Sequence, residues 1–342
     1  MKVRYYTKYS DLGPSSRYRV FQFLDLFQNQ GVDLRVQTLF DDSYFEFLRS
    51  SSSLSRTIQK SGYVASRFEE RRKALRGDHS NLTIIEQQLF PYIPYPIEKH
   101  FLPDRYLLEM DDAIYLTHPK KIPELVRTAS AVLVGNRTLA DFAGRFNQNV
   151  HIVPTVLNTD IFRPATKIND GKIRIGWSGL EYNFKYLKRL SPVFSHLKTK
   201  YPVEFVVLSG SEPRNLEFPF RFVKWDSKHE VEQMNQFDIG VMPLEMDEWS
   251  RSKCGMKLLQ YMALKIPSVA TPAGVNAEII REGENGFTAL TEQDWIEQIS
   301  ELIESAELRD KMGKLARETV VEQYSVHTWF PKLLEVYRKY AQ

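Results

Sequence analysis

The sequence predicts an α/β protein with two doubly wound domains, each built on a largely parallel sheet, facing a central cleft. Short, β-rich apolar runs alternate with helical stretches in the first half of the chain. The alternation restarts in the second half, after a segment rich in turn-forming residues. A chain of 342 residues is long enough for two separate cores.

The first series of strand-like runs predicts one sheet. Helical stretches separate these runs, notably at 17–30 and 139–146. Strands that alternate with helices favour a parallel, doubly wound arrangement. The runs are VRYYT from position 3, VDLRVQTLF from 32, LTIIE from 82, AVLVGN from 131 and VHIVP from 150.

The second series predicts a second sheet, and a turn-rich linker around Pro164 separates the two. We therefore expect an amino-terminal domain over 1–164 and a carboxyl-terminal domain over 165–325. The last stretch, 326–342, has apolar residues at helical spacing, and we expect this helix to cross back onto the first domain. The strand-like runs of the second series are KIRIGWSG from position 172, VEFVVLSG from 203, FRFVKW from 220, FDIGVMPL from 237 and IPSVATP from 266.

Composition predicts a reducing, cytoplasmic setting. The single cysteine, Cys254, cannot form an internal disulfide, and the first residues lack the apolar stretch of a secretory signal. No run approaches the roughly 20 apolar residues that cross a bilayer, so we expect any membrane contact to be peripheral.

The net charge of +3 is unevenly distributed. Between Arg49 and Arg76 lie eight basic residues against two acidic ones, Glu69 and Glu70. Such a stretch suits an anionic surface, and we predict peripheral attachment to the inner face of the cytoplasmic membrane, with no nucleic-acid partner. The competing interpretation is a helix face that meets only solvent.

Open α/β sheets bind ligands beyond the carboxyl ends of their strands, so we look for function there. No glycine-rich dinucleotide fingerprint follows a strand, and no phosphate loop ending in Gly-Lys-Ser/Thr is present. These absences argue against a dehydrogenase and against a nucleoside triphosphatase.

The segment 252–290 is the most informative. Gly255 is predicted to begin a helix whose free amides and dipole suit an anionic group such as a diphosphate. Lys257 and Gln260, three residues apart, are expected to share a face that points into the cleft. The alternative is an exposed Lys257, which is unfavourable near a helix start unless an anion offsets its charge.

In this segment, DIGVMPL followed by KCGMKLLQYMALKIPSVATPAGVNAEIIREGENGF resembles the donor-binding signature of glycosyltransferase family 4. GPSSRYRVFQFL, EMDDAIY and VPTVLNTDIFRP extend the resemblance along essentially the whole chain. The resemblance implies the GT-B fold of two Rossmann-like domains. It also implies transfer of a sugar from a nucleotide diphosphate donor with retention of configuration, without a divalent metal or other cofactor.

The sequence departs from the family at two positions. The family carries two glutamates separated by seven residues, and the matching positions are Ser252 and Gln260. The resemblance implies that the first contacts the transferred sugar and the second the ribose. Lys253 and Lys257 mark a lysine-rich variant, and the predicted donor loop also includes Cys254, Gly255 and Met256.

Two further loops complete the predicted donor site. Ser178 and Gly179 end a strand, and either Lys185 or Lys188 on the following helix is expected to reach a phosphate; the alternative is that both lysines are solvated. Gly13 follows the first strand and resembles the family's glycine loop, which lets the backbone approach the donor phosphates.

For the acceptor, the first domain offers Arg17, Arg19, Asp111 and Asp112. An arginine fork suits phosphate or an acidic group, although two arginines two positions apart on a helix do not share a face. Asp112 is the candidate sugar-hydroxyl ligand, with a helix-capping or turn role as the alternative. A metal site is disfavoured because adjacent carboxylates on a strand point to opposite faces.

These features predict a glycosyltransferase that moves a sugar to a glycan, lipid-linked or small-molecule acceptor, in the synthesis of cell-surface polysaccharide or glycoconjugate. Lys257, Lys185 and Asp112 are the predicted catalytic residues, since preorganised cations stabilise the charge that grows on a leaving diphosphate. A nucleotide-sugar epimerase of the same fold and a non-catalytic ligand-binding protein remain as alternatives.

Overall fold

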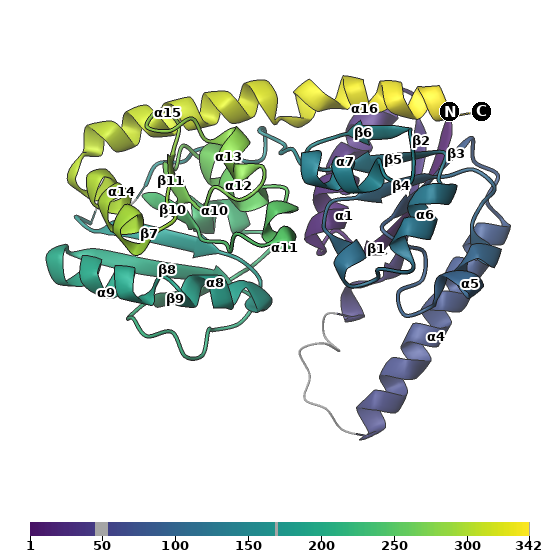
Figure 1. Cartoon of the computed structure of the whole chain (residues 1–342), viewed down its shortest axis with the longest axis horizontal. Helices are drawn as coiled ribbons and strands as arrows, with labels where there is room; N and C mark the ends of the chain where they lie inside the picture. Colours follow the sequence, from purple (N-terminus) through teal and green to yellow (C-terminus); the bar gives the residue numbers. More distant parts are fainter. Residues whose placement is uncertain (45–53, 168–169, 342) are drawn as a thin grey trace. The chain divides into compact units, whose positions relative to one another are not determined.

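The computed structural model describes residues 1–44, 54–167 and 170–341. The chain divides into two compact units (Figure 1). Unit 1 comprises Met1–Pro154 and Trp329–Gln342, and unit 2 comprises Thr155–Thr328. The division after Pro154 lies earlier in the chain than the expected boundary at 164.

Unit 1 contains a six-stranded parallel sheet of order β2-β1-β3-β4-β5-β6. Its central strands are buried on both faces, which is why they read as continuous apolar runs in the sequence. The predicted parallel sheet is confirmed. The strands are β1 (Lys2–Tyr9), β2 (Asp33–Phe40), β3 (Leu82–Glu86), β4 (Leu107–Met110), β5 (Ala131–Val134) and β6 (Val150–Ile152).

The helices of unit 1 connect these strands. The helix expected over 17–30 is broken at Val20, whose φ of −134° and ψ of −48° lie outside the helical region. The described helices are α1 (Pro14–Arg19), α2 (Leu24–Asn29), α4 (Leu54–Arg76), α5 (Tyr95–Glu98), α6 (Ile122–Thr128) and α7 (Arg137–Ala143), with short 3₁₀ helices at Phe21–Phe23, Lys99–Phe101 and Ile114–Leu116.

The carboxyl-terminal helix α16 (Val326–Tyr340) packs its last turns onto unit 1. Tyr337 is fully buried and stacks on Phe27 of α2, with 5.2 Å between ring centroids. Phe330 meets the same ring edge-on at 4.9 Å. The apolar side of α16 is therefore covered by the first half of the chain.

Unit 2 contains a second six-stranded parallel sheet, of order β12-β11-β10-β7-β8-β9. Its core includes Phe194, Val241 and Trp295, all buried. The second predicted sheet is thus also confirmed. The strands are β7 (Ile173–Ser178), β8 (Val203–Ser209), β9 (Arg221–Lys224), β10 (Ile239–Met242), β11 (Ser268–Ala270) and β12 (Phe287–Thr288).

Helices follow most strands of unit 2. They are α8 (Phe184–Lys188), α9 (Ser191–Lys200), α10 (Glu230–Met234), α11 (Glu248–Arg251), α12 (Met256–Ala263), α13 (Asn276–Ile279), α14 (Glu292–Glu304) and α15 (Ala306–Gln323), with a 3₁₀ helix at Glu181–Asn183.

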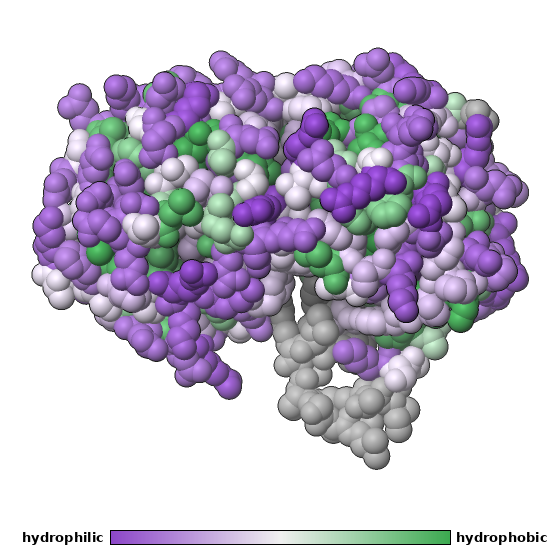
Figure 2. Space-filling view, viewed as in Figure 1, coloured by the Kyte–Doolittle hydropathy of each residue, from purple (hydrophilic) through white to green (hydrophobic). Residues whose placement is uncertain are grey.

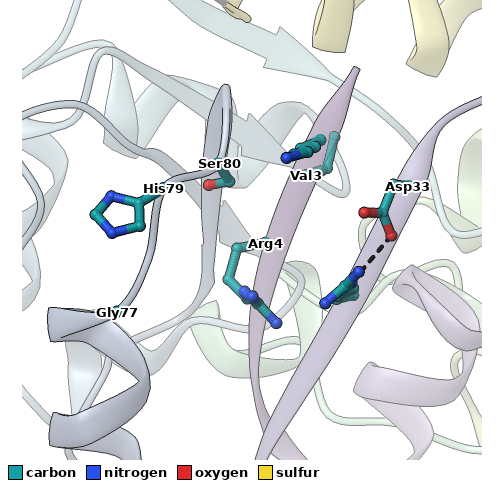
Figure 3. A pocket seen from close by; sticks show the side chains of 8 residues that line it. Val3, Arg4, Asp33, Gly77, His79 and Ser80 are labelled. Carbon is teal, nitrogen blue, oxygen red and sulfur yellow. Dashed lines mark hydrogen bonds and ion pairs between the residues drawn. The ribbon is translucent and has the colours of Figure 1, made fainter.

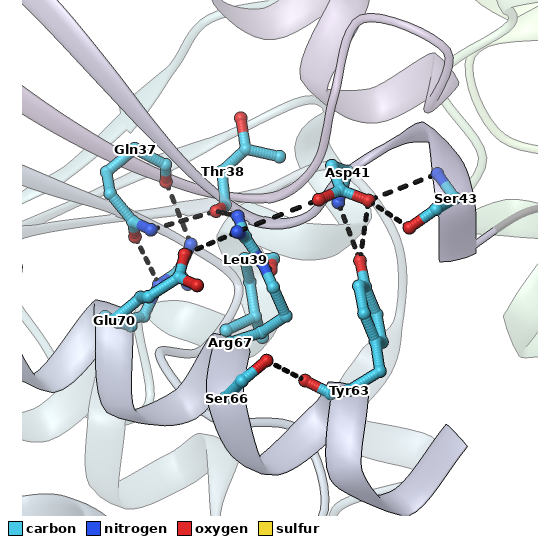
Figure 4. A network of polar contacts seen from close by, with 10 residues as sticks. Gln37, Thr38, Leu39, Asp41, Ser43, Tyr63, Ser66, Arg67 and Glu70 are labelled. Carbon is cyan, nitrogen blue, oxygen red and sulfur yellow. Dashed lines mark hydrogen bonds and ion pairs between the residues drawn. The ribbon is translucent and has the colours of Figure 1, made fainter. Parts of the chain in front are cut away.

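The basic stretch predicted on 49–76 forms much of α4, and the structure changes its interpretation. Arg71 is fully buried and donates to the carbonyl oxygens of Thr7, Gln37 and Leu89. Arg67 donates to the carbonyl of Leu39 at 2.7 Å (Figure 4). Counting Arg71 among the surface cations was wrong, because its guanidinium binds strand and loop carbonyls inside unit 1.

The rest of this stretch contributes less free positive charge than its composition suggests. Arg72 forms an ion pair with Glu69, and Arg67 pairs with Glu70. Lys73 remains largely exposed, with its ammonium 3.9 Å from Glu69. Arg49 lies outside the described residues.

In the described part of the chain, no helix is both long and apolar enough to cross a membrane. On the face shown in Figure 2, hydrophilic residues cover most of both units, and the hydrophobic residues lie in small separate groups.

Candidate functional site

In each unit the parallel strands end at one edge of the sheet, where α/β proteins bind ligands. In unit 2 this edge lies at Ser178, Ser209, Met242 and Ala270, the last residues of β7, β8, β10 and β11. The loops that leave these strands contain most of the predicted donor residues.

Gly255 begins α12 in the left-handed region, with φ +68°. A Cβ at this position would lie 2.9 Å from Cδ1 of Ile279 and 3.1 Å from Cγ2 of Val275. Only glycine fits both the backbone angle and this close packing. The eight-residue helix therefore starts against the segment that follows β11, and its first amides have no partner within the helix.

Gly274, in the loop after β11, has a similar role that the sequence analysis missed. Its φ is +55°, and an added Cβ would lie 2.0 Å from the carbonyl oxygen of Arg251. The loop thus packs directly on the end of α11. The Pro-Ala-Gly run at 272–274 was the signal, because such turn residues permit close approach of two backbones.

At the end of β7, hydrogen bonds to neighbouring elements of unit 2 fix the backbone. The N–H of Ser178 donates to the hydroxyl of Tyr261 at 2.8 Å, and burial raises the pKa of that tyrosine. The N–H of Gly179 donates to the carbonyl of Leu208 at 3.1 Å. A Cβ on Gly179 would lie 2.4 Å from the Trp177 ring, so the turn requires glycine.

The Oγ atoms of Ser178 and Ser209 are buried at neighbouring strand ends. Neither has a hydrogen-bond partner among the described residues. Buried hydroxyls usually have a hydrogen-bond partner, so a ligand at this edge of the sheet could bond to these two.

Of the two candidate lysines on α8, Lys185 faces the loop after β10. Its Nζ lies 3.4 Å from a carboxylate oxygen of Glu245, and Arg189 approaches the other oxygen at 3.3 Å. Lys188 instead lies 3.9 Å from Glu217. More than half of the Lys185 side chain is exposed, and ion pairs of this kind contribute little, so an anionic ligand could compete with Glu245.

The loop before α12 is partly accessible. Lys253, Cys254, Met256 and Lys257 are each partly exposed. The Nζ of Lys253 lies 5.7 Å from the centroid of the Trp249 ring, within the range of a cation–π contact.

Two residues that were predicted to bind the sugar donor are buried inside unit 2. Gln260 is fully buried, and its Nε2 donates to a carboxylate oxygen of buried Glu230 at 3.1 Å. Ser252 is also fully buried and donates to the carbonyl of Glu248 at 3.0 Å. The expectation that Gln260 and Lys257 share an open face was wrong, because α12 turns position 260 into the interior of unit 2.

In unit 1, Gly13 precedes α1 at the carboxyl end of β1. A Cβ there would lie 2.5 Å from the Cβ of Tyr9, so the loop can fold back on the strand only with glycine. Glu86, at the end of β3, holds this loop: its carboxylate accepts from the N–H of Lys8 at 2.7 Å and from the hydroxyl of Ser16 at 2.8 Å.

Glu86 was not among the predicted site residues. An acidic residue that ends a buried apolar strand is unusual and was the signal for it. Burial, together with a smaller effect of the nearby charge of Asp111, raises its pKa from 4.5 to about 7. The carboxyl can therefore exchange a proton near neutral pH at the carboxyl edge of the unit 1 sheet, where the predicted acceptor residues lie.

Arg19 is buried, and its predicted role as an acceptor ligand does not fit its position. Its Nε donates to Glu109 at 2.6 Å, and its Nη1 donates to the carbonyl of Val153 at 2.7 Å. Arg17 is partly exposed and donates to the carbonyl of Asp11 at 2.6 Å. Of the two arginines, only Arg17 stays accessible.

Asp111 and Asp112 follow β4 directly and are partly exposed. The side-chain amide of Gln87 donates to Asp111 at 3.0 Å. Within the described ranges, no group of three or more His, Cys, Asp or Glu side chains could hold a metal ion.

Residues 172–305 match the family model described as Glycosyl transferases group 1. This range lies in unit 2 and includes Ser178, Lys185, Gly255 and Lys257. The family therefore matches the half of the chain in which the candidate donor loops converge.

Two curated proteins of Bacillus subtilis (strain 168) are similar in sequence. The "Putative glycosyltransferase EpsD" is 24% identical over 216 residues, which cover 58% of this chain and 56% of that protein. Spore coat protein SA is 31% identical over 81 residues, covering 23% of this chain and 22% of that protein. The similar regions thus span at most about half the length of these relatives.

Solved structures show the fold. Sucrose-phosphate synthase from Thermosynechococcus elongatus has a TM-score of 0.75 at 12% identity, covering 99% of this chain and 98% of that chain. Anabaena HepE in complex with UDP-glucose has a TM-score of 0.71 at 13% identity, covering 99% and 100%. The two Rossmann-like sheets of this chain thus have the GT-B architecture of these proteins.

A separate pocket of about 130 Å³ lies at the opposite edge of the unit 1 sheet (Figure 3). It is lined by residues at the amino-terminal ends of β1 and β2, including Arg4 and Arg35, and by His79. Arg35 is paired with Asp33 at 3.1 Å. Because ligands of parallel α/β sheets bind at the other edge, this pocket does not coincide with the candidate site.

Proposed function

We propose that this chain is a glycosyltransferase, which moves a sugar from a nucleotide diphosphate sugar to an acceptor. The observation that supports this most is the match of 172–305 to the group 1 family, because that range includes the glycine-dependent start of α12 and the loops beside it. The solved structure of HepE with UDP-glucose, a protein of the same fold, makes a uridine nucleotide sugar the first donor to test.

In this proposal, the first amides of α12 and Lys257 bind the diphosphate. A helix start presents N–H groups and partial positive charge to an anion. Lys185 leaves its ion pair with Glu245 and pairs with a phosphate of the same diphosphate. Negative charge grows on the leaving diphosphate as the glycosyl bond breaks, so cations and amides fixed in advance lower the barrier.

We also propose transfer with retention, without a divalent ion or another cofactor. These two features come from the resemblance to family 4, and the lysines of the donor loop supply positive charge where a metal would otherwise do so. Because Ser252 and Gln260 are buried, we propose that other groups contact the sugar and the ribose.

The proposed acceptor is a glycan or a lipid-linked sugar, bound by unit 1 near Asp112 and Arg17. We propose a cytoplasmic enzyme that attaches peripherally to an anionic membrane through exposed cations of α4 such as Lys73. In vesicle cosedimentation, replacing Lys73 and Arg76 with Glu should abolish binding to anionic vesicles. Equal binding by the double variant and the unaltered chain would refute this attachment.

Thermal denaturation with nucleotides tests the proposed function. A bound ligand stabilises the folded chain by an amount that grows with the logarithm of its concentration above Kd. UDP or another nucleoside diphosphate should raise Tm in this way, and Lys257→Ala should reduce the shift. If no nucleotide or nucleotide sugar changes Tm, the proposal is wrong. Release of nucleotide only when an acceptor is present would further distinguish transfer from epimerisation.

A further inference from the structure

The loop between β3 and α5, residues 87–94, has an unusual backbone. Gln87 and Tyr92 have φ values of 59° and 74°, in the left-handed region that side chains other than glycine rarely adopt. Four non-glycine residues of the described chain have a positive φ, and two of them lie on this loop. Such strain persists only where the surrounding structure enforces it, and it is concentrated at functional sites.

A buried ion pair holds the loop in this conformation. Glu98 of α5 is fully buried and accepts from the N–H groups of Leu89 at 2.9 Å and Phe90 at 3.3 Å. Lys121 lies 2.5 Å from Glu98 and donates to the carbonyls of Phe90 and Ile93, both at 2.8 Å. Donors and acceptors of the loop backbone are thus fixed together by two charged side chains.

The result of this arrangement is an exposed aromatic ring. Tyr92 is 71% exposed, although it is a large side chain on a tightly held backbone. Its hydroxyl lies 3.4 Å from that of Tyr44, and Tyr44 stacks on Phe40 at the carboxyl end of β2, with 4.3 Å between centroids. The contact between the two hydroxyls leaves most of the Tyr92 ring in solvent, and a strained φ destabilises the fold, so a ligand that covers the ring is the better explanation for both features.

The position of the loop indicates the kind of ligand. The loop leaves β3 at the carboxyl edge of the unit 1 sheet, and its first residue, Gln87, donates to Asp111. An exposed aromatic ring on a fixed backbone, beside the hydroxyl of Tyr44, is suited to a pyranose, whose C–H face packs on the ring while its hydroxyls bind polar groups. A loop fixed in advance lowers the entropic cost of such binding.

We propose that Tyr92 is a carbohydrate-stacking residue, whose ring packs against a sugar of the acceptor at the carboxyl edge of unit 1. This inference rests on the proposed glycosyltransferase function and adds that the acceptor is recognised through a sugar ring. A lipid or peptide acceptor without a sugar would not use this residue.

Saturation-transfer NMR tests the inference with simple probes. Methyl glycosides of glucose, galactose, mannose and N-acetylglucosamine are added singly, at millimolar concentration, to the full chain. Tyr92→Gly removes the ring and relieves the left-handed φ, so this variant should have an equal or higher Tm yet lose the glycoside signal. Tyr92→Trp should keep the signal, and Ile97→Ala, which removes an exposed side chain from neighbouring α5, serves as the matched control.

Two results would overturn the inference. One is a glycoside signal of equal strength in the unaltered chain and Tyr92→Gly, and the other is no signal with any glycoside in the unaltered chain. The Tm shift with UDP, GDP, ADP and TDP is measured on the same samples. If nucleotides raise Tm while Tyr92→Gly leaves glycoside binding unchanged, only the role of Tyr92 fails. If neither these nucleotides nor any nucleotide sugar raises Tm, the proposed function itself fails.

Discussion

The start of α12 depends on Gly255 because this residue has no side chain. Its positive φ is one requirement, and the close approach of Ile279 is a second. Gly283 has a similar φ of +74°, but nothing lies within 4 Å of the place where its Cβ would be. These two glycines allow backbone strain and side-chain packing to be measured separately.

We predict that Gly255→Ala lowers the free energy of unfolding by more than Gly283→Ala does. The Gly283 substitution introduces only left-handed strain, on the order of 1 kcal/mol, whereas the Gly255 substitution also displaces Ile279. Urea unfolding of the two variants measures the difference. Equal losses would mean that the start of α12 adjusts easily, and that the helix is not a rigid anion site.

Lys257 is predicted to act on the transition state more than on the bound donor. Because charge on the diphosphate grows as the bond breaks, Lys257→Ala should lower kcat by about 10²-fold or more with a smaller change in donor KM. Steady-state kinetics with a nucleotide sugar test this, with Lys311→Ala on the exposed side of α15 as the control. An unchanged kcat with a raised KM would assign Lys257 to ground-state binding alone.

Helix α4 is attached to the sheet of unit 1 through a buried cation. Arg71 binds backbone carbonyls that lie far apart in the sequence, whereas neighbouring Arg72 pairs with Glu69 at the surface. Charge counting along the sequence treats these two arginines alike. Only the tertiary position of the carbonyls distinguishes them.

We therefore predict that Arg71→Met destabilises unit 1 by about 3 kcal/mol or more, because it leaves several buried carbonyls without a donor. Arg72→Met should cost less than about 1 kcal/mol, as expected for an exposed pair. Chemical denaturation followed by circular dichroism gives both values. Similar losses in the two variants would argue that Arg71 does not hold α4 in place.

Glu86 connects β3 to the loop between β1 and α1, and its burial makes that link dependent on pH. Its pKa is raised from 4.5 to about 7, so the folded chain binds a proton that the unfolded chain has lost between these values. Its contribution to stability is therefore fully present below about pH 4.5 and is lost as the pH rises through 7.

The expected size of this effect is roughly 3 kcal/mol, from the change in pKa at 1.36 kcal/mol per unit. Glu86→Gln should keep the hydrogen bonds from Lys8 and Ser16 without the titration. Relative to the unaltered chain, the variant should gain stability between pH 5 and pH 7.5, as measured by unfolding free energies. A constant difference between the two chains across this range would contradict the assigned pKa.

For the whole molecule, the two parallel sheets could be predicted because buried strands read as continuous apolar runs separated by helical stretches. The start of α12 at Gly255 could also be predicted, since a local turn requirement is visible in the sequence. The burial of Gln260 could not, because its partner Glu230 lies thirty positions away in the chain. Arg19 was misjudged for the same reason, since Glu109 and Val153 are distant in sequence.

Mass spectrometry of an acceptor tests the proposed transfer of a sugar from a nucleotide diphosphate donor. Oligosaccharide and lipid-linked acceptors are incubated with UDP-glucose and other nucleotide sugars, with and without EDTA. We expect one acceptor to gain the mass of one hexose or other sugar unit, with nucleoside diphosphate released in equal amount, and the reaction to persist in EDTA. Loss of transfer in EDTA that Mg²⁺ restores would refute metal independence alone. If no acceptor gains mass and no nucleotide sugar is consumed or bound, the chain is not a glycosyltransferase.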